Sequence, residues 1–379
     1  MYRKFTAPLI FNGKDFLEPG LSLVTDETGT IIDITAEEVS DERYEGILMP
    51  GMVNCHCHTE LSHLKERIPK HTGLVGFVQQ VMQQRFQPQE VKEAAINSAI
   101  HEMQQQGIVA VGDICNTSDT VSHKKKSSIA WRNFIEVTGM VESTAAQRMA
   151  EAEAVAGAFS EADMVPHAPY SVSPALFHLI NEKNRRLISI HNQETPGEDE
   201  FLMKGQGDFL KLYEQLGISL YAFNASGKTS LQTWLPYFTH EQPVIAVHNT
   251  CTHDEDIQFA YASAHAMFYC VCINANLYIE QKLPPIDAFI RNRCTVVLGT
   301  DSLASNSQLS ILEEMRTVHR YFPHIPLASL LQWATLNGAL ALDLNHLGSF
   351  ETGKKPGVLL LRGLENEKIA ARTSVERLI

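Results

Sequence analysis

Several features that mark membrane or nucleic-acid-binding proteins are absent from this sequence. No apolar run is long enough to span a membrane, and the N-terminus has no cationic segment followed by an apolar one. Basic residues are few, because 31 Lys and Arg stand against 44 Asp and Glu, for a formal net charge of −13. Such a charge argues against nucleic acid or an anionic membrane as the main partner. We expect a cytoplasmic protein whose partner is a small molecule.

Cysteine is also scarce, and its distribution excludes a disulfide framework. The chain has seven cysteines, an odd number, and several lie inside apolar runs that look like strands. This pattern is typical of a reduced intracellular protein. No cysteine pair has the spacing of a zinc ribbon. Cys251 lies near a strand end, and the sequence leaves open whether it is buried or lines a pocket.

What the sequence does contain is a repeated alternation of strands and helices. Its 379 residues are 44% hydrophobic, as expected of a globular enzyme with a large core. Eight apolar runs alternate with helical periodicity from Pro50 onward, and they predict strands at Met52–His58, Ile108–Ile114, Trp131–Thr138, Met164–His167, Leu187–His191, Val244–His248, Met267–Ile273 and Thr295–Gly299. Helices are expected between them, including one over Gly73–Gln106. Eight such units favour an α/β fold closed as a (β/α)₈ barrel. The alternative, a doubly wound sheet, would usually show a glycine-rich phosphate loop, and none is present.

The two ends of the chain resemble each other and differ from the middle. Short strand-like pieces occur at Phe5–Phe11, Ser22–Asp26 and Ile31–Thr35, and strand-like character returns in the tail around Val358–Leu361. We therefore predict that residues 1–49 and 345–379 form one small β-domain that flanks a barrel over residues 50–344.

Polar residues at the ends of the predicted strands indicate a metal site. His56 and His58 end the first strand two residues apart, so both imidazoles point to one face. Barrel enzymes carry their chemistry at such carboxyl ends. The other predicted strands with polar ends contribute His167, His191, His248 and Asp301. Five histidines and an aspartate at strand ends predict that a divalent metal binds here.

The order of these motifs resembles the amidohydrolase superfamily, and within it the branch of hydrolytic deaminases. The resemblance covers nearly the whole chain and is carried by PGMVNCHCH, HAPYS, HNQET, LGTDSLASN with the LEEMR helix, and ATLNGALAL followed by GSFETGKKPGVLLL. It implies a single divalent ion, Zn²⁺ or alternatively Fe²⁺, with the ligands His56, His58, His191 and Asp301. The fourth strand does not end in a lysine that could be carbamylated to bridge a second ion.

The resemblance also implies catalytic roles. Asp301 would accept a proton from the attacking water, and His248 would orient that water or the leaving group. Glu194, three residues after His191, would protonate a ring nitrogen of the substrate and then the departing ammonia. Without the neighbouring histidine, Glu194 would read as a surface residue at the start of a helix.

The segment HTELSHLK, followed by GLVGFVQQVMQQR, is more similar to aminodeoxyfutalosine deaminases than to guanine or cytosine deaminases. Those enzymes act on an adenine nucleoside that carries a benzoate group, on a route to menaquinone. The candidate substrate-binding residues are Glu60, His63, Arg85, His167 and Asn276. Glu60, His63 and Arg85 could equally be ordinary helix residues.

The sequence departs from the family pattern at two positions, and two other functions are alternatives to a deaminase. The family often has a Cys-Pro-x-Ser-Asn segment, whereas here Ile273 replaces the proline and Ala275 the serine, which weakens the transfer of any particular substrate. One alternative is a chlorohydrolase, although expelling chloride needs no acid such as Glu194. The other is a non-catalytic barrel that keeps its metal, although no ligand has been lost. Large barrel enzymes often pair, so a homodimer is considered.

Overall fold

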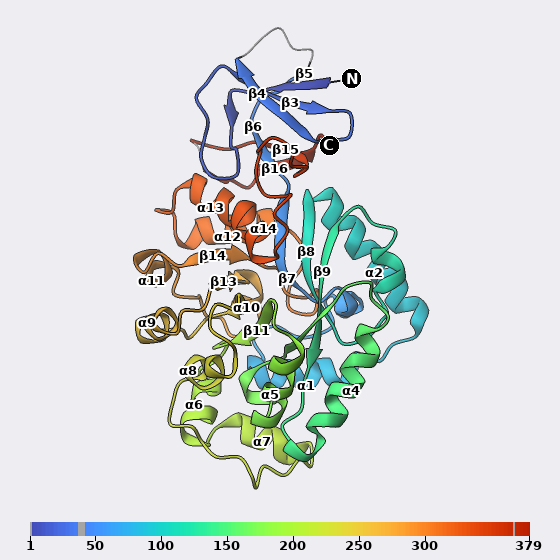
Figure 1. Ribbon diagram of the computed structural model, residues 1–379, viewed down its shortest axis with the longest axis vertical. Coiled ribbons are helices and arrows are strands. Elements are labelled where there is room, and N and C mark those ends of the chain that lie inside the picture. Colours follow the sequence, from blue (N-terminus) through green and yellow to red (C-terminus); the bar gives the residue numbers. More distant parts are fainter. Residues whose placement is uncertain (1, 37–41, 367) are drawn as a thin grey trace.

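The computed structural model describes residues 2–36, 42–366 and 368–379 (Figure 1). Every strand predicted between residues 50 and 300 is present. These strands are β7 (Met52–Cys57), β8 (Ile108–Cys115), β9 (Ala130–Val137), β10 (Asp163–Pro166), β11 (Ile188–Asn192), β12 (Val244–His248), β13 (Met267–Val271) and β14 (Thr295–Leu298). Most of their residues are buried, because helices cover the strands from outside.

The eight strands form two parallel four-stranded sheets, which we call the first and the second half-sheet. The first has the order β10-β9-β8-β7 and the second the order β11-β12-β13-β14. Backbone hydrogen bonds join the halves where strands end: His191 N–H donates to His167 O at 3.0 Å, and Thr300 and Asp301 N–H donate to His56 O at 3.1 Å. The predicted α/β class with parallel strands is therefore confirmed. These bonds also bring His56, His191 and Asp301 to the junctions of the two halves.

The helices largely follow the prediction, with one correction. The single helix predicted over Gly73–Gln106 is in fact two, α1 (Gly73–Gln84) and α2 (Gln89–Gln105). Pro88 separates them, because proline disfavours helical geometry in the residue before it and is itself suited to a helix start.

The other described helices are α3 (Val121–Lys124), α4 (Ala145–Ala156), α5 (Pro174–Lys183), α6 (Pro196–Lys204), α7 (Asp208–Gln215), α8 (Ser230–Trp234), α9 (Asp254–Ala262), α10 (Ile273–Ile279), α11 (Ile286–Arg291), α12 (Ile311–Tyr321), α13 (Leu327–Ala334) and α14 (Leu336–Ala341). Short 3₁₀ turns occur at η1 (Thr59–Leu64), η2 (Glu142–Thr144), η3 (Pro169–Ser171) and η4 (Leu235–Tyr237). None of the described helices is both long and apolar enough to cross a membrane.

The chain ends form two further sheets at one end of the molecule (Figure 1). Their strands are β1 (Tyr2–Thr6), β2 (Leu9–Ile10), β3 (Leu21–Asp26), β4 (Ile31–Ala36), β5 (Glu42–Arg43), β6 (Ile47–Pro50), β15 (Val358–Arg362) and β16 (Ser374–Arg377). The predicted single strand Phe5–Phe11 is wrong, because Pro8 lacks an N–H and separates β1 from β2, which lie in different sheets.

The strands β6 and β15 join the two ends of the chain, since they pair antiparallel from Val358 opposite Pro50 to Leu361 opposite Ile47. Only Gly51 separates β6 from β7. A Cβ atom at Gly51 would lie 2.2 Å from a methyl carbon of Val109 and 2.6 Å from Pro356 O, so the chain passes through a gap that only glycine fits. The domain boundaries at residues 49/50 and 344/345 stay a prediction.

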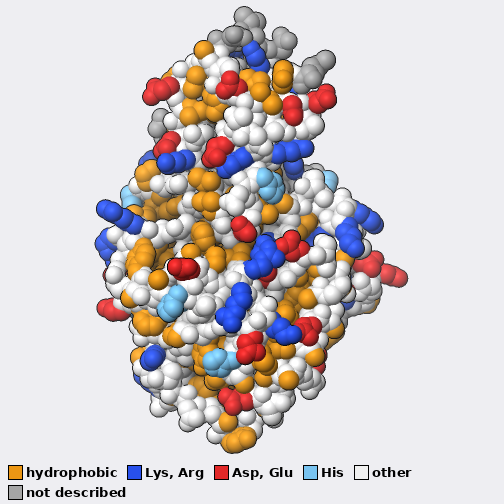
Figure 2. All heavy atoms as spheres, viewed as in Figure 1, with side chains coloured by type: hydrophobic (Ala, Val, Ile, Leu, Met, Phe, Trp, Pro, Cys, Tyr) orange, Lys and Arg blue, Asp and Glu red, His pale blue; other side chains and the backbone are white. Residues whose placement is uncertain are grey.

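The surface in Figure 2 mixes acidic, basic and apolar side chains, and positive charge forms no continuous tract on that face. On that face the basic side chains are interspersed with acidic ones rather than gathered into one large patch.

Candidate metal centre and substrate pocket

Three imidazoles converge where the half-sheets meet. His56 and His58 lie at the end of β7, and His191 lies in β11. The Nε2 atom of His58 is 3.2 Å from Nε2 of His56 and 3.3 Å from Nε2 of His191. All three side chains are buried. Burial lowers the pKa of His56 to about 4 and lowers the pKa of His191 well below its ordinary value, so both imidazoles are neutral and offer lone pairs.

Asp301 completes the cluster from the loop after β14. Its Oδ1 atom lies 3.6 Å from His56 Nε2 and 3.5 Å from His58 Nε2. Ser305 Oγ donates to the other carboxylate oxygen. Burial alone would raise the pKa of Asp301. The contact with His56 and the nearby histidines have the larger effect, so the pKa lies well below the usual range. Asp301 is therefore an anion with one oxygen directed at the imidazoles of His56 and His58.

The backbone around Asp301 explains how this geometry arises. Asp301 has a φ of +56°, a left-handed conformation uncommon for a residue with a side chain. Asn54 holds the preceding residue, because its side chain donates to Thr300 Oγ1 at 2.8 Å and accepts from Thr300 N–H at 3.1 Å. Gly299 lets the chain pass His56, since a Cβ atom there would lie 2.9 Å from His56 Cβ.

These residues fit a single divalent cation. Four ligands held tetrahedrally at about 2.0–2.1 Å from zinc lie roughly 3.3 Å apart, which matches the Nε2 separations of His56, His58 and His191. His191 Nδ1 donates to His167 O at 2.8 Å, so its Nε2 carries the lone pair that a metal needs. Without a cation, several lone pairs and a carboxylate would face one another in a buried space.

A second acid–base pair lies beside the cluster. His248, at the end of β12, has its Nδ1 2.8 Å from Asn276 Oδ1, which leaves Nε2 free, 3.6 Å from Glu194 Oε1. Glu194 is buried, and burial together with the negative charges of Asp301 and Glu280 raises its pKa well above the ordinary value. Glu194 therefore holds a proton at neutral pH, while neutral His248 can accept or relay one.

The turn that presents Glu194 is fixed from several sides. Gln193 has a φ of +46°. Its N–H donates to Glu198 Oε1 at 2.8 Å, and its side chain donates to Asp256 Oδ2 at 2.9 Å. Ser230 Oγ also donates to Glu198. The position of Glu194 is thus set by contacts at the start of α6 and α9.

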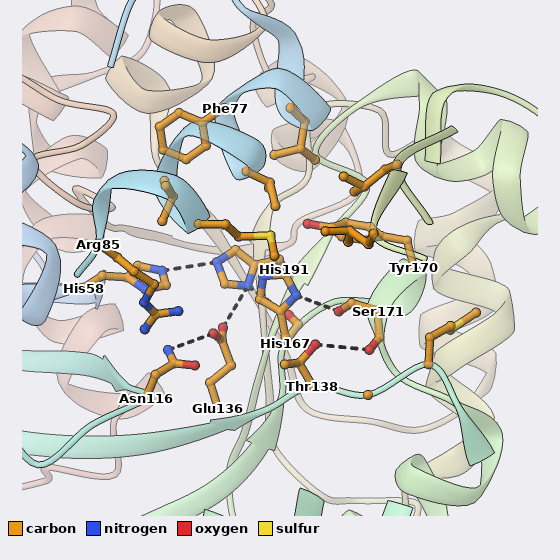
Figure 3. A pocket seen from close by; sticks show the side chains of 18 of the residues that line it. His58, Phe77, Arg85, Asn116, Glu136, Thr138, His167, Tyr170, Ser171 and His191 are labelled. Atoms are coloured by element: carbon orange, nitrogen blue, oxygen red, sulfur yellow. Dashed lines mark hydrogen bonds and ion pairs between the residues drawn. The ribbon is translucent and has the colours of Figure 1, made fainter. Parts of the chain in front are cut away.

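The cluster opens into a cavity of about 440 Å³, a volume typical of small-molecule sites (Figure 3). One side of the cavity is apolar, and Figure 3 shows Phe77 there, away from the polar side chains. This side is formed mainly by α1 and α7, with Leu74, Phe77, Val78, Val81, Met82, Leu212, Tyr213 and Leu216. The opposite side is polar and carries Arg85, Asn116 and Glu136 (Figure 3).

Three of the five predicted substrate contacts line this cavity, namely Glu60, Arg85 and His167. Glu60 is occupied by the protein, since its Oε2 accepts from the N–H groups of Asn116 and Thr117 at 3.0 and 2.9 Å. Arg85 Nη2 lies 3.3 Å from Glu60 Oε1. His167 Nδ1 is 2.6 Å from Ser171 Oγ.

The other two candidates are not among the described residues that line the cavity. His63 lies behind it, with its ring nitrogens 3.1 Å from the carbonyl oxygens of Glu60 and Arg85. Asn276 contacts His248 instead. Cys251 is buried, and Lys282 Nζ lies 3.2 Å from its Sγ atom. All of these assignments stay predictions.

Sequence reasoning missed Glu136 and the aromatic wall of the cavity. Glu136 comes near the end of β9 in the segment AWRNFIEV, where a single acid among apolar residues was the available signal. Tyr170 stacks on Phe209 with ring centroids 4.2 Å apart, and its carbonyl accepts from Tyr213 OH at 2.7 Å. Phe209 and Tyr213 lie four residues apart on one face of α7, whereas Tyr170 comes from η3 and meets them only in the fold.

The comparisons with known proteins agree with this geometry. The family model described as the amidohydrolase family matches residues 47–375. A 5-methylthioadenosine/S-adenosylhomocysteine deaminase from Pelotomaculum thermopropionicum is 26% identical over 336 residues, which covers 83% of this chain and 72% of that protein.

Two solved structures share the fold. Helicobacter pylori aminofutalosine deaminase, in complex with methylthio-coformycin, has a TM-score of 0.83 at 22% identity and covers 100% of both chains. Atrazine chlorohydrolase from Arthrobacter aurescens, complexed with zinc, has a TM-score of 0.74 at 16% identity and covers 94% of this chain and 86% of that one.

Proposed function

This chain belongs to the amidohydrolase family, and from that premise we propose that it is a metal-dependent hydrolytic deaminase. Its substrate would be an adenine-nucleoside-like heterocycle, and its products a carbonyl compound and ammonia. The observation that carries the proposal is the buried carboxyl of Glu194, 3.6 Å from His248 and next to three convergent histidines at the base of a cavity. The deaminase named among the relatives supports the same reaction.

The ligands we propose are His56, His58, His191 and Asp301, and the ion we propose is zinc, with Fe²⁺ as the alternative. When bound, such an ion supplies a water acidified from a pKa of roughly 15.7 to about 7. Asp301 Oδ1 would accept a proton from the attacking water, because Ser305 donates to the other carboxylate oxygen, Oδ2. Asn276 fixes the ring of His248, so that its Nε2 can orient the attacking water.

Glu194 supplies the acid. Its proton passes to the ring nitrogen beside the carbon that bears the amino group, which makes that carbon electrophilic. Water oxygen adds to the carbon as one of its protons passes to Asp301. The remaining hydroxyl proton returns to the Glu194 carboxylate as the carbonyl forms, and the C–N bond breaks when the proton held by Asp301 passes to the amine, which leaves as ammonia. Burial suits Glu194 to this step, because it keeps the carboxyl protonated until substrate arrives.

For the substrate we propose aminodeoxyfutalosine, in the route to menaquinone. The fold likeness to an aminofutalosine deaminase is consistent with this substrate. The cavity supports it through its composition, since an apolar side formed by α1 and α7 suits the benzoate ring. Arg85 and Arg148 line the same cavity and could pair with the carboxylate. Glu60 and His167 line the cavity too and complete the proposed set of substrate-binding residues, whereas His63 and Asn276 contact Arg85 and His248 from behind.

The proposal extends to the closure of the sheet, the terminal β-domain, the location of the protein and its oligomeric state. We infer that the two half-sheets close into an eight-stranded barrel, supported by the bonds from His191, Thr300 and Asp301 across their junctions. The terminal sheets would form the flanking β-domain. A cytoplasmic location and a homodimer are part of the same proposal.

The test is ammonia release by metal-loaded protein from aminodeoxyfutalosine, methylthioadenosine, S-adenosylhomocysteine, adenosine, guanine and cytosine, with chloride release from a chlorinated triazine measured alongside. We expect ammonia from an adenine nucleoside and none from Glu194→Gln with its metal still bound. Glu200→Gln, on the exposed face of α6, is the matched control and should keep full activity. Chloride release without ammonia would replace the deaminase with a chlorohydrolase. Silence on every substrate would reject both.

A further inference from the structure

One buried carboxylate in the cavity has no role in the reaction described above. Glu136 lies near the end of β9, its side chain is 7% exposed, and it lines the cavity beside His167 and His191 (Figure 3). Its Oε2 accepts from Asn116 Nδ2 at 3.1 Å. Its Oε1 is buried and has no hydrogen-bond partner among the described residues. A buried acceptor left unpaired is costly, so the atom requires a donor from outside the protein.

The neighbouring histidines cannot supply that donor. His191 Nδ1–H is already used, since it donates to His167 O at 2.8 Å, whereas Glu136 Oε1 is 3.5 Å away. Ser171 Oγ, which donates to Ala168 O at 3.1 Å, is placed to accept from His167 Nδ1–H at 2.6 Å. The Nε2 atom of neutral His167 then has no proton to offer to Glu136. Both rings therefore leave Oε1 of Glu136 unsatisfied.

A second metal ion is also excluded as the missing partner. Glu136, His167 and His191 could place one donor atom each within 4.8 Å of the others. However, His191 would have to use Nδ1, because its Nε2 faces His58. That Nδ1 carries the proton donated to His167 O. A protonated nitrogen cannot bind a metal, so the group is not a metal site.

A hydroxyl group of the substrate is the donor that fits. Glu194 and His248 belong to the second half-sheet, where the heterocycle must react, and Glu136 belongs to the first. A substrate that fills the cavity from one half to the other places its sugar on the polar side formed by Arg85, Asn116 and Glu136. A carboxylate accepts hydroxyl donors and repels a phosphate or another carboxylate.

We propose that Glu136 determines specificity for the sugar of the substrate, by accepting a hydrogen bond from a ribose hydroxyl at Oε1. The proposal rests on the deaminase function. A hydroxyl–carboxylate hydrogen bond in a buried site contributes enough to change affinity by about 10- to 100-fold. Because the sugar lies away from the reacting carbon, the effect should be larger on KM than on kcat.

The experiment compares adenosine, 2′-deoxyadenosine and 3′-deoxyadenosine as substrates of the metal-loaded wild type and of Glu136→Gln. In the wild type, removal of one hydroxyl should lower kcat/KM by about 10- to 100-fold. In Glu136→Gln, the value for adenosine should fall by a similar factor, and the penalty for the missing hydroxyl should shrink to within about twofold. Glu142→Gln, an exposed acid after the same strand, is the control and should keep the wild-type pattern.

The outcomes separate this inference from the proposed function. If ammonia is released but both deoxy penalties are equal in the wild type and in Glu136→Gln, the assignment of Glu136 is wrong and the deaminase stands. If no amine is released, the deaminase fails, and calorimetric binding of inosine against its 2′- and 3′-deoxy forms still decides the role of Glu136 without turnover. Loss of metal from Glu136→Gln with hydroxyl preference intact would show that Glu136 supports His191 instead, and would overturn the proposal.

Discussion

The two half-sheets treat their buried acids differently. In the first, Asp113 and Asp163 each face a cation, since Lys124 Nζ is 2.5 Å from Asp113 Oδ2 and Arg132 Nη2 is 2.6 Å from Asp163 Oδ2. The loops and helices that follow the second half-sheet also bury two glutamates, Glu198 and Glu314, whose hydrogen-bond donors are neutral.

Glu198 accepts from Ser230 Oγ and the Gln193 N–H, while Glu314 accepts from the side chains of Asn274 and Asn306 at 2.8 and 2.9 Å. Burial raises the pKa of both to about 8. Lys124 and Arg132 thus lie against Asp113 and Asp163 in the first half, whereas burial favours the protonated form of Glu198 and Glu314 in the second, the state in which Glu194 can act as a proton donor.

The largest expected effect concerns Glu194, which follows a strand of the second half-sheet. Glu194→Gln removes the proton donor while keeping shape and burial, so kcat on the best amine substrate should fall by about 10²- to 10⁴-fold. Metal content, measured by atomic absorption, should not change, because Glu194 is not among the proposed ligands. Retention of more than a tenth of the activity would remove Glu194 from the mechanism.

In the first half-sheet, the largest expected effect is a loss of stability when a buried ion pair is broken. Lys124→Met leaves Asp113 buried without its cation, which should lower the free energy of unfolding by about 3–5 kcal/mol in urea denaturation. The double variant Lys124→Met/Asp113→Asn should recover most of this loss.

The matched control for Lys124 is Lys183→Met. Lys183 pairs with Glu153 at 2.7 Å on the surface, and its loss should cost less than about 1 kcal/mol. An equal loss in Lys124→Met and Lys183→Met would mean that burial does not distinguish these two ion pairs.

The pH dependence of stability should reveal whether Glu314, whose hydrogen-bond donors are neutral amides, is protonated in the folded protein. Its folded pKa of about 8 lies above the unfolded value of 4.5, so the folded state binds the proton more tightly. Its contribution to stability is therefore full below pH 4.5 and is lost as the pH rises through about 8. Glu314→Gln cannot lose a proton, and its stability relative to the wild type should improve by a few kcal/mol, in order of magnitude, between pH 5 and pH 8.5. A constant difference across that range would show that Glu314 is ionised when folded.

The smallest effect concerns the junction between the halves. Gly299→Ala would place a methyl group 2.8 and 2.9 Å from the Sγ atoms of Cys270 and Cys272, and 2.9 Å from His56 Cβ. We expect a loss of about 1–3 kcal/mol in unfolding free energy and weaker metal binding in a chelator competition. Gly157→Ala, at the end of α4, is the control, because a new Cβ there would meet no atom beyond its chain neighbours closer than 3.6 Å, and it should leave metal binding unchanged. Equal metal affinity in all three proteins would show that the two halves are not tightly coupled at Gly299.

Some of these features could be predicted from the sequence, and others depend on contacts that only the fold creates. The strands were predictable because each is apolar along its length, and the histidines because strand ends collect at one edge. Phe5–Phe11 and Gly73–Gln106 were predicted as single elements because periodicity outweighed Pro8 and Pro88. Glu136 was missed because its importance lies in an unpaired oxygen, and only the arrangement of donors around it in space reveals that.

The antiparallel pairing of β6 with β15 has a consequence for how the site is assembled during synthesis. The strand that carries His56 and His58 follows β6 after one glycine, yet the antiparallel partner of β6 begins at Val358, near the end of the chain. A ribosome therefore makes the first two proposed ligands early and the strand that fixes their approach late. Until Val358–Arg362 has emerged, β6 has only the two-residue strand β2 beside it. The histidine-bearing strand β7 can pair with β8 as soon as that strand is made, whereas β6, which leads into it, lacks its antiparallel partner until β15 follows.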